Sequence, residues 1–406
     1  MRLPDRLRRA CLRGGAVKIL LLAPQPFYEE RGTPIAVDLL LKALSDRGES
    51  VDVLTYPIGE DRQYPGVTLH RLPKIPGIRK VKPGPSLPKI VCDVVMMFRA
   101  ARMARRTRYD VVHAVEESVF MAWWLRRWRR LPYVYDMDSC MSRQIVDKFR
   151  WLGLFAAIMM GCEGVAIRSA EAVVPVCESL EDEARRQSAR KTFRLSDISL
   201  LRKTAPTEAE RALFPPAEAG CRLVYVGNLE SYQGIDLLLE SFRRLGADPA
   251  APPAQLIVAG GVPADVARYR ERCAELGLAA RVRFLGPQPV ERLGALLELA
   301  DVVVSPRTQG NNTPMKIYSY MASGKPILAT DLATHTQVLT PEIALLASPA
   351  PQAFAEAMGR LVADADLRRR LGAAAQAEAE RNYSPDAFRR NVNQIYDWIG
   401  GQLKPA

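Results

Sequence analysis

Short apolar runs alternate with stretches of helical spacing along most of the chain. Residues 17–23 (VKILLLA) form an unbroken apolar run, which is typical of a strand buried on both faces. A polar loop follows at 24–34, and residues 35–47 then show helical spacing before Gly48, a residue type that often ends helices. Residues 51–56 predict the next strand. This order of strand, helix and strand predicts a parallel, doubly wound sheet.

The same alternation continues, is interrupted, and then begins again. Further short strands are expected at 111–113, 132–136 and 172–176. Residues 181–220 are rich in charge, Pro and Ala, and we place the linker between two domains there. After the linker, strands separated by helices are predicted at 222–226, 255–259, 282–285, 301–305 and 326–329. The predicted architecture is therefore α/β, with two doubly wound Rossmann-like domains facing a cleft.

The length of the chain agrees with this division. Its 406 residues suit two domains of ~150–200 residues each. We expect an N-terminal domain over residues 1–200, beginning with a tail at 1–16, and a second domain over residues 201–385. The remaining residues, 386–406, are expected to form a helix that packs back on the N-terminal domain.

Composition excludes several classes of protein. The chain is 48% hydrophobic and 25% charged, which is ordinary for a globular protein and excludes a disordered or fibrous one. The longest apolar run, residues 151–162, is shorter than the ~20 residues of a spanning helix, so an integral membrane protein is not expected. None of the seven cysteines forms a C-x-x-C pair, and the N-terminus lacks the apolar core of a secretory signal. These features favour a cytoplasmic location.

Positive charge is concentrated in the first half of the chain. Residues 1–200 contain 34 Lys and Arg against 23 Asp and Glu, a net charge of +11, whereas residues 201–406 have a net charge of +1. Basic stretches lie at 74–89 and 99–108, and residues 123–130 read WWLRRWRR. Trp and Arg beside apolar residues are typical of a membrane interface, so we favour peripheral association with the anionic inner face of a membrane. An ordinary solvated helix face is the alternative, and no nucleic-acid-binding module is recognisable.

Two segments of the second half indicate a family. In residues 223–242 (LVYVGNLESYQGIDLLLESF), a strand runs into a Gly turn and a second Gly opens a helix. In residues 305–330 (SPRTQGNNTPMKIYSYMASGKPILAT), a loop opens a helix that ends in a Gly-Lys-Pro turn. Together with GESVDVLTY at 48–56 and YDVVHA at 109–114, they resemble glycosyltransferase family 4, a family of retaining enzymes with the GT-B fold. The resemblance extends over nearly the whole chain.

The resemblance implies a nucleotide-sugar donor on the C-terminal domain and a lipid-linked or saccharide acceptor on the N-terminal domain, with no cofactor. The leaving diphosphate needs positive partners, which helix N-termini and Gly turns supply through backbone N–H groups. On the residues that match, we expect the donor to be bound by Gly32, Thr33, Asn228, Gln233, Gly234, Arg307, Asn311, Asn312, Thr313, Lys316 and Ser319.

The chain departs from the family pattern at five of its charged or catalytic positions. Two cations that hold the diphosphate in the family match Asn228 and Gln233, and two glutamates match Asn311 and Ser319. A histidine of the family falls at Asp138. One interpretation is a degenerate site in a protein that binds nucleotide sugars without catalysis; a sugar-nucleotide epimerase of the same architecture is another.

The interpretation that we favour is an active transferase with relocated charges. Arg307 follows a predicted strand, and Lys316 lies in the first turns of the next predicted helix. Either side chain can supply positive charge to a diphosphate, while Asn and Ser can still hydrogen-bond sugar hydroxyls.

Catalytic candidates lie where two strands of the first half end. His113 and the pair Glu116-Glu117 follow one strand, and one of these glutamates, of which we favour Glu117, can accept a proton from an acceptor hydroxyl. Carboxylates also favour helix N-termini for structural reasons. Asp136 and Asp138 follow another strand as a D-x-D pair. Asp138 is a candidate catalytic or acceptor-side carboxylate; a helix cap or, less favoured, Mg²⁺ or Mn²⁺ binding are the alternatives. No G-x-S-x-G or P-loop motif is present, which disfavours a serine hydrolase and a P-loop nucleotidase.

Overall fold

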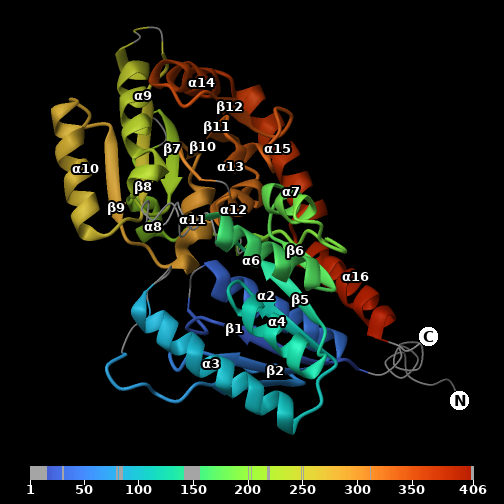
Figure 1. Ribbon diagram of the computed structural model, residues 1–406. Coiled ribbons are helices and arrows are strands. Elements are labelled where there is room, and N and C mark those ends of the chain that lie inside the picture. Colours follow the sequence, from blue (N-terminus) through green and yellow to red (C-terminus); the bar gives the residue numbers. More distant parts are fainter. Residues whose placement is uncertain are drawn as a thin grey trace, which may run out of the picture. The chain divides into compact units, whose positions relative to one another are not determined.

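The computed structural model divides the chain into two compact units (Figure 1). Unit 1 contains residues 1–196 and 388–406, and unit 2 contains residues 197–387. The structure describes residues 16–29, 32–78, 81, 86–140, 156–199, 201–202, 204–216, 220–247, 249, 251–310 and 312–403.

Unit 1 is built on a parallel six-stranded sheet in the order β3-β2-β1-β4-β5-β6. Its strands are β1 (Lys18–Ala23), β2 (Ser50–Thr55), β3 (Val67–Arg71), β4 (Val111–Val115), β5 (Tyr133–Met137) and β6 (Ala172–Pro175). The central strands β1 and β4 are covered on both faces and are apolar along nearly their whole length, as the pattern of the sequence predicts.

Helices connect these strands and cover the sheet. They are α2 (Gly32–Arg47), α3 (Leu87–Arg106), α4 (Ser118–Arg129), α6 (Ala156–Ser169) and α7 (Glu178–Arg186). Helix α3 buries Cys92, Met96, Ala100 and Ala104, which recur every four residues and therefore lie on one face of the helix. This face packs into the core that contains Leu20 and Leu22 of β1.

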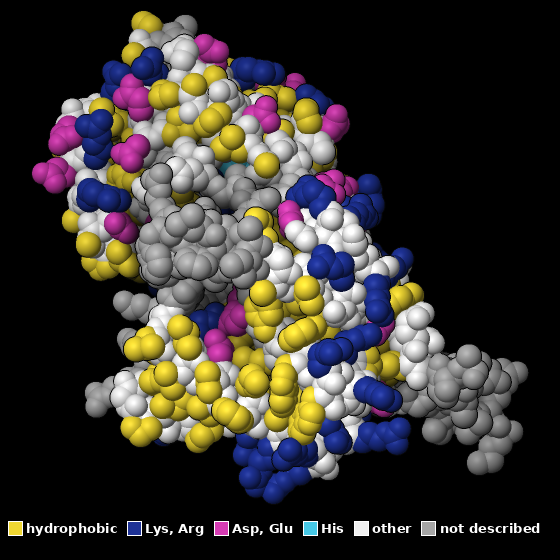
Figure 2. All heavy atoms as spheres, in the orientation of Figure 1, with side chains coloured by type: hydrophobic (Ala, Val, Ile, Leu, Met, Phe, Trp, Pro, Cys, Tyr) yellow, Lys and Arg dark blue, Asp and Glu magenta, His cyan; other side chains and the backbone are white. Residues whose placement is uncertain are grey.

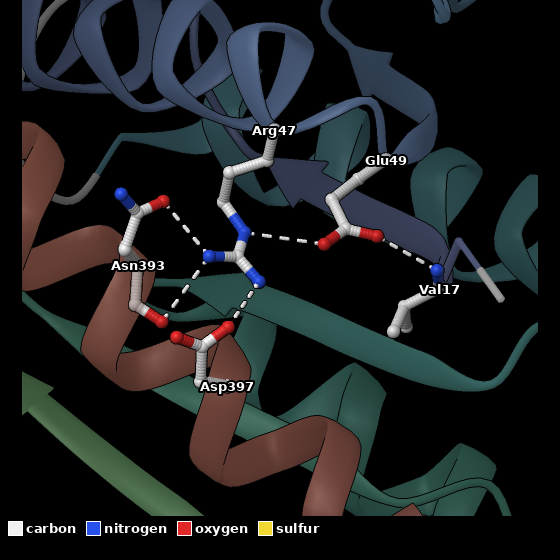
Figure 3. A network of polar contacts seen from close by, with 5 residues as sticks. All are labelled: Val17, Arg47, Glu49, Asn393 and Asp397. Carbon is white, nitrogen blue, oxygen red and sulfur yellow. Dashed lines mark hydrogen bonds and ion pairs between the residues drawn. The ribbon is translucent and has the colours of Figure 1, made fainter. Parts of the chain in front are cut away.

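The last helix, α16 (Pro385–Leu403), belongs to unit 1 from Phe388 onward. The guanidinium of Arg47, the last residue of α2, donates to the backbone oxygen and the Oδ1 of Asn393 at 3.2 and 2.8 Å, and to Oδ1 of Asp397 at 3.0 Å (Figure 3). Its Nε donates to Glu49, whose other oxygen accepts from the backbone N–H of Val17 at 2.7 Å. One arginine thus ties α16 to the edge of the sheet where β1 begins.

The sheet of unit 2 has the strand order β12-β11-β10-β7-β8-β9. Read from β9 to β12, this order gives the third, second, first, fourth, fifth and sixth strands of the unit, which is the topology of unit 1. The strands are β7 (Cys221–Val226), β8 (Ala254–Ala259), β9 (Val282–Gly286), β10 (Val302–Ser305), β11 (Ile327–Thr330) and β12 (Leu345–Ala347). The helices of this unit are α8 (Glu208–Ala212), α9 (Ile235–Ala247), α10 (Pro263–Glu275), α11 (Leu293–Glu298), α12 (Met315–Ser323), α13 (Ala333–Thr336), α14 (Pro351–Ala363) and α15 (Ala365–Asn382), with 3-10 turns at Ser231–Gln233 and Val290–Arg292.

Some elements differ from the prediction. The edge strands β3 and β12 were not expected, because the side chains of an edge strand are half-exposed and give a weak apolar signal. The stretch predicted as a linker, 181–220, contains most of α7, a short helix with many charged residues that buries Leu180 and Ala184. Among the described residues, no helix is both long and apolar enough to cross a membrane.

Candidate active site

Each sheet has one position where the direction of strand succession reverses. In unit 1 this position lies between β1 and β4, and in unit 2 it lies between β7 and β10. Doubly wound sheets bind ligands at this point, outside the carboxyl ends of the strands, because the loops there diverge to opposite faces. The loops after these four strands contain most of the residues that the sequence singles out.

In unit 2, glycines allow the loops after β7 and β10 to approach each other closely. Gly227 and Gly234 have φ angles of 150° and 75°, which side chains other than Gly rarely adopt. A Cβ atom on Gly234 would lie 2.0 Å from the backbone oxygen of Pro306. A Cβ atom on Gly227 would lie 3.2 Å from Nζ of Lys316. Both positions therefore require glycine for the loops to pack as they do.

Lys316, in the first turn of α12, points into this group of loops. Its Nζ donates to Oε1 of Gln233 at 3.0 Å and lies 4.1 Å from the centre of the Tyr225 ring. Burial, together with a smaller contribution from the neighbouring charge of Arg307, lowers the pKa of Lys316 to about 7. Among the described residues, no carboxylate pairs with this ammonium group, so it keeps the capacity to bind an anion.

Arg307 lies just after β10, where it is partly buried. Its Nε donates to the backbone oxygen of Gln309 at 2.7 Å, and its guanidinium lies 5.1 Å from the centre of the Tyr232 ring. Burial lowers the pKa of Arg307 from its usual value. Arg307 and Lys316 both lie among the loops after β7 and β10, so the fold brings two cations to the same switch point.

The remaining predicted donor residues of unit 2 surround these cations or lie nearby on α12. Gln233 is buried beside Tyr225, whose hydroxyl donates to the backbone oxygen of Asn228 at 2.6 Å. Ser319 is buried on α12. Asn311 lies outside the described residues.

The loop that leads into α12 contains an unsatisfied hydroxyl. The backbone oxygen of Asn312 accepts hydrogen bonds from Thr334 at 2.8 Å and from Arg307 at 3.3 Å. The neighbouring Thr313 has a buried Oγ1 atom for which the described part of the chain provides no hydrogen-bond partner. Buried polar atoms without a partner are rare in proteins and commonly meet a ligand or a water molecule.

His335 contacts the strand ends that carry this site, a structural role that its sequence context did not indicate. The side chain is fully buried, with Nε2 2.9 Å from Oγ of Ser305 and Nδ1 3.0 Å from Oγ1 of Thr330. The hydroxyl of Thr330 also contacts the backbone oxygen of Arg307 at 2.5 Å. Burial lowers the pKa of His335 to about 3, so the ring is neutral at pH 7. Neutral His335 thus joins the ends of β10 and β11 below Arg307.

In unit 1, Gly32 and Thr33 are the first two residues of α2, on the connection that follows β1. Gly32 is exposed, and a Cβ atom there would meet nothing within 4 Å. Packing therefore does not require glycine at this position. The assignment of both residues to the donor site stays a prediction.

His113 forms part of a buried hydrogen-bonded network near the carboxyl end of β4. The side chain is 1% exposed, and its Nε2 lies 3.1 Å from Oδ2 of Asp136 on β5. Its Nδ1 lies 2.9 Å from the hydroxyl of Tyr396, and the two rings are stacked. The sequence could not indicate Tyr396, which comes from α16, far along the chain. Both ring nitrogens of His113 thus have protein partners.

Two glutamates follow His113 at the carboxyl edge. Glu117 pairs with Nζ of Lys89 at 2.6 Å, a contact that the basic composition of that segment did not reveal. Glu116 has a φ angle of 48°, which is unusual for this residue type. Burial, together with a smaller contribution from the charge of Glu117, raises the pKa of Glu116 to about 7. Glu116, the member of the pair that the sequence analysis favoured less, is therefore a second candidate acid or base.

Asp138 lies immediately after β5, at the same edge of the sheet, and is partly buried. Asp136, the other member of the D-x-D pair, is directed toward His113. Among the described residues, no group of three or more His, Cys, Asp or Glu side chains is arranged to hold a metal ion. The structure thus gathers His113, Glu117 and Asp138 at one sheet edge, while their catalytic roles stay predictions.

Comparison with known proteins agrees with this geometry. Residues 31–193 match the family described as "Glycosyl transferase 4-like domain", and residues 208–378 match "Glycosyl transferases group 1". The D-inositol 3-phosphate glycosyltransferase of Corynebacterium urealyticum is 30% identical over 199 residues, which are 47% of this chain and 46% of that protein. The chain spans about half the length of the Corynebacterium relatives that it matches.

Solved structures show the same fold. Sucrose-phosphate synthase from Thermosynechococcus elongatus superposes with a TM-score of 0.75 at 22% identity, over 95% of this chain and 100% of that one. Anabaena HepE in complex with UDP-glucose superposes with a TM-score of 0.70 at 17% identity, over 94% of this chain and 99% of that one. The GT-B fold is therefore confirmed, and the chain belongs to the group 1, family 4-like glycosyltransferases.

Proposed function

We propose that the protein transfers a sugar, with retention of configuration, from a nucleotide sugar to a lipid-linked or saccharide acceptor at the inner face of a membrane. The observation that carries this proposal is the pair of cations, Lys316 and Arg307, at the switch point of unit 2. A sugar nucleotide leaves a diphosphate behind when its glycosidic bond breaks, and two cations can stabilise the charge that develops there. Membership of the glycosyltransferase family supports the same chemistry.

The two cations offset the neutral residues at the family's usual cationic positions. Gln233 occupies one of those positions, and its amide oxygen accepts a hydrogen bond from Lys316. In this proposal, the positive charge lies in the first turn of α12 instead of the 3-10 turn before α9, and it stabilises the same diphosphate. The hydroxyl of Thr313, just before that helix, has no hydrogen-bond partner among the described residues and is suited to a phosphate or sugar oxygen.

On the acceptor side, the leaving phosphate would itself help to remove the proton of the acceptor hydroxyl, so no protein nucleophile is required. Glu116 and Glu117 would hydrogen-bond that hydroxyl at the carboxyl edge of unit 1. The pKa of Glu116, raised to about 7, suits a group that exchanges a proton near neutral pH. His113 would act by holding Asp136 in place, because its own nitrogens are both engaged.

Calorimetric titration with UDP, GDP and ADP, with and without EDTA, tests the donor site. UDP is the first choice because HepE was solved with UDP-glucose. We expect one nucleotide to bind independently of EDTA, and we expect Lys316→Ala and Arg307→Ala each to weaken its binding at least about tenfold, since charge-assisted hydrogen bonds contribute ~1.5–3 kcal/mol. Unchanged affinity in both variants would refute the relocated-charge explanation. Binding that needs a metal would instead favour Asp136 and Asp138 as ligands.

Catalysis is tested separately, by release of nucleotide from the sugar donor. Release that depends on an added acceptor supports a transferase. Nucleotide binding without release from any donor would favour the non-catalytic alternative, for which the neutral residues Asn228 and Gln233 argue. Conversion of the donor sugar with no acceptor present would favour an epimerase.

Membrane association rests on the far ends of α3 and α4. Five arginines, Arg105, Arg106, Arg108, Arg129 and Arg130, line a hollow of about 500 Å³ there. Two of them lie near the ring of Trp128, whose centre is 4.8 Å from the guanidinium of Arg105 and 5.6 Å from that of Arg129. Arginine and tryptophan together favour an anionic lipid interface.

Co-sedimentation with vesicles tests this association. The protein should sediment with phosphatidylcholine vesicles that contain phosphatidylglycerol and stay in solution with phosphatidylcholine alone. The double variant Arg105→Glu/Arg129→Glu should lose this binding, while the matched double variant Arg243→Glu/Arg272→Glu, on exposed helix faces of unit 2, should keep it. Equal binding to both kinds of vesicle would refute an electrostatic association.

A further inference from the structure

Helix α3 of unit 1 has a second apolar face, which is turned to solvent. Its core face is the buried row described above, whereas Leu87, Ile90, Val94 and Phe98 on the other side are 73%, 57%, 51% and 70% exposed. Helices of globular proteins normally place charged residues on that side. In Figure 2, hydrophobic side chains gather over α3 and α4, and Lys and Arg side chains lie beside them. A large exposed apolar patch of this kind marks a binding surface.

The patch contains a cavity of about 640 Å³, inside the ~300–1,000 Å³ range of small-molecule sites. Helices α3, α4 and α6 form its walls, and its apolar lining includes Ile90, Val94, Met97, Phe120, Trp123 and Trp124. Leu87 and Phe98 belong to the same exposed face of α3 but do not line the cavity. The apolar side chains that line this cavity can hold a narrow apolar occupant such as a hydrocarbon chain.

Polar groups line this otherwise apolar cavity at one place. Asp93 and Glu117 both contribute to the lining, and Glu117 is the second residue after β4, at the carboxyl edge where the acceptor is proposed to bind. The hydroxyl of Tyr56 donates to Oδ1 of Asp93 at 2.6 Å, and Lys89 pairs with Glu117. Burial, together with a smaller contribution from the charge of Glu117, raises the pKa of Asp93 to about 7, so near neutral pH its carboxyl can also donate a hydrogen bond. The cavity thus connects the candidate acceptor edge with the exposed apolar face.

We propose that this cavity binds the hydrocarbon chain of the acceptor, so that the acceptor is a lipid rather than a free saccharide. The chain would lie between α3, α4 and α6, and the lipid's sugar or hydroxyl group would reach the carboxyl edge beside Glu117. The arginine hollow at the far ends of α3 and α4 supports a lipid as the occupant, because it gives the same face the charge that an anionic membrane attracts. This inference rests on the proposed transferase function, which it makes more specific.

A brominated amphiphile tests the assignment directly. Bromine quenches tryptophan fluorescence on contact, and Trp123 and Trp124 line the cavity. We expect ω-bromododecyl maltoside, titrated below its micelle concentration into the full chain, to quench the fluorescence saturably. Ile90→Glu and Val94→Glu should raise its dissociation constant at least about tenfold, because a carboxylate would then face the chain. Both side chains are half-exposed, so the variants should fold, which an unchanged thermal transition would verify.

Leu87→Glu and Phe98→Glu are the matched controls. They add the same charge to the same exposed helix face, outside the cavity, and should change the dissociation constant by less than about twofold. Quenching of the unaltered protein that does not saturate, or an equal loss of affinity in all four variants, would overturn the proposal. In the second case, the whole face would adsorb amphiphiles without a defined chain site.

Nucleotide binding by unit 2 separates this inference from the proposed function. Saturable quenching in a protein that binds none of the three nucleotides would refute the transferase proposal and leave a lipid-binding cavity. Nucleotide binding and donor turnover without saturable quenching would refute the chain site alone, and a free saccharide would then be the acceptor.

Discussion

Lys316 is expected to take up a proton when a nucleoside diphosphate binds to unit 2. Burial and the charge of Arg307 lower its pKa to about 7, so at pH 8 about nine in ten molecules of the free protein have a neutral amine. A diphosphate beside the amine would favour the ammonium form and return the pKa toward its usual range. Binding at pH 8 should therefore take up about 0.9 proton at this residue. The phosphates contribute little, because their second pKa is about 6.

The same linkage sets how affinity depends on pH. Above pH 7 the free protein must first gain the proton, so affinity should fall as pH rises, approaching about tenfold for each pH unit. From pH 7 to 9 the loss from this residue alone amounts to about fiftyfold. Below pH 7 the amine is already protonated in the free protein, so the contribution of Lys316 becomes constant.

Calorimetry at pH 8 in Hepes and in Tris measures the uptake, because the two buffers differ in the heat released when they give up a proton. Lys316→Met removes the titrating group but keeps most of the side-chain volume, and it should abolish the uptake. Lys325→Met is the matched control, since Lys325 also lies in unit 2 but donates to the backbone oxygen of Glu298 instead. An uptake below about 0.3 proton in the unaltered protein, or full uptake in Lys316→Met, would refute the reasoning.

Three further predictions concern the framework of the two sites. Gly277 has a positive φ angle and open space where a Cβ atom would lie, so Gly277→Ala should cost ~1–2 kcal/mol of stability. At Gly234 a Cβ atom would also meet a backbone oxygen, so Gly234→Ala should cost more and abolish nucleotide binding. Equal losses of stability in denaturant titrations of the two variants would contradict this. His335 stays neutral in the folded state down to pH about 3 but protonates below pH 6.5 when unfolded, so stability should fall by ~1.4 kcal/mol per pH unit below 6.5 from this residue. The His335→Gln variant should lack that part of the slope, and an unchanged slope in urea titrations would refute it. Tyr396→Phe keeps the ring but removes the partner of Nδ1 of His113, which should cost ~1–3 kcal/mol; an unchanged urea midpoint would show that this hydrogen bond contributes nothing.

Much of the fold could be predicted from local patterns. The apolar runs that became β1 and β7 are continuous because central parallel strands are buried on both faces. The glycines at 227 and 234 were recognisable as turn residues, since few other residues adopt a positive φ angle. The same reasoning did not find β3, because an edge strand buries too little apolar surface to produce a clear pattern.

Candidate donor residues could be proposed from the sequence, but the electrostatic environment of their side chains could not. The sequence by itself pointed to Lys316 and Arg307 as the remaining cations. It could not indicate that Lys316 would be buried against Gln233 and the ring of Tyr225, which lie on the loop and strand of another βα unit. The lowered pKa follows from that burial and from the neighbouring guanidinium, so it depends on contacts that only folding creates.

The sequence by itself determined the fold class, the two doubly wound sheets and the positions of the glycine turns, because apolar periodicity and backbone preferences are local properties. Only the tertiary structure decided which side chains meet. It placed Tyr396 of the last helix against His113, gave Glu117 its partner Lys89, and left an apolar face of α3 uncovered beside the carboxyl edge. Contacts between residues far apart in the chain, and the desolvation that shifts their pKa values, depend on the packing of whole elements, which no local pattern encodes.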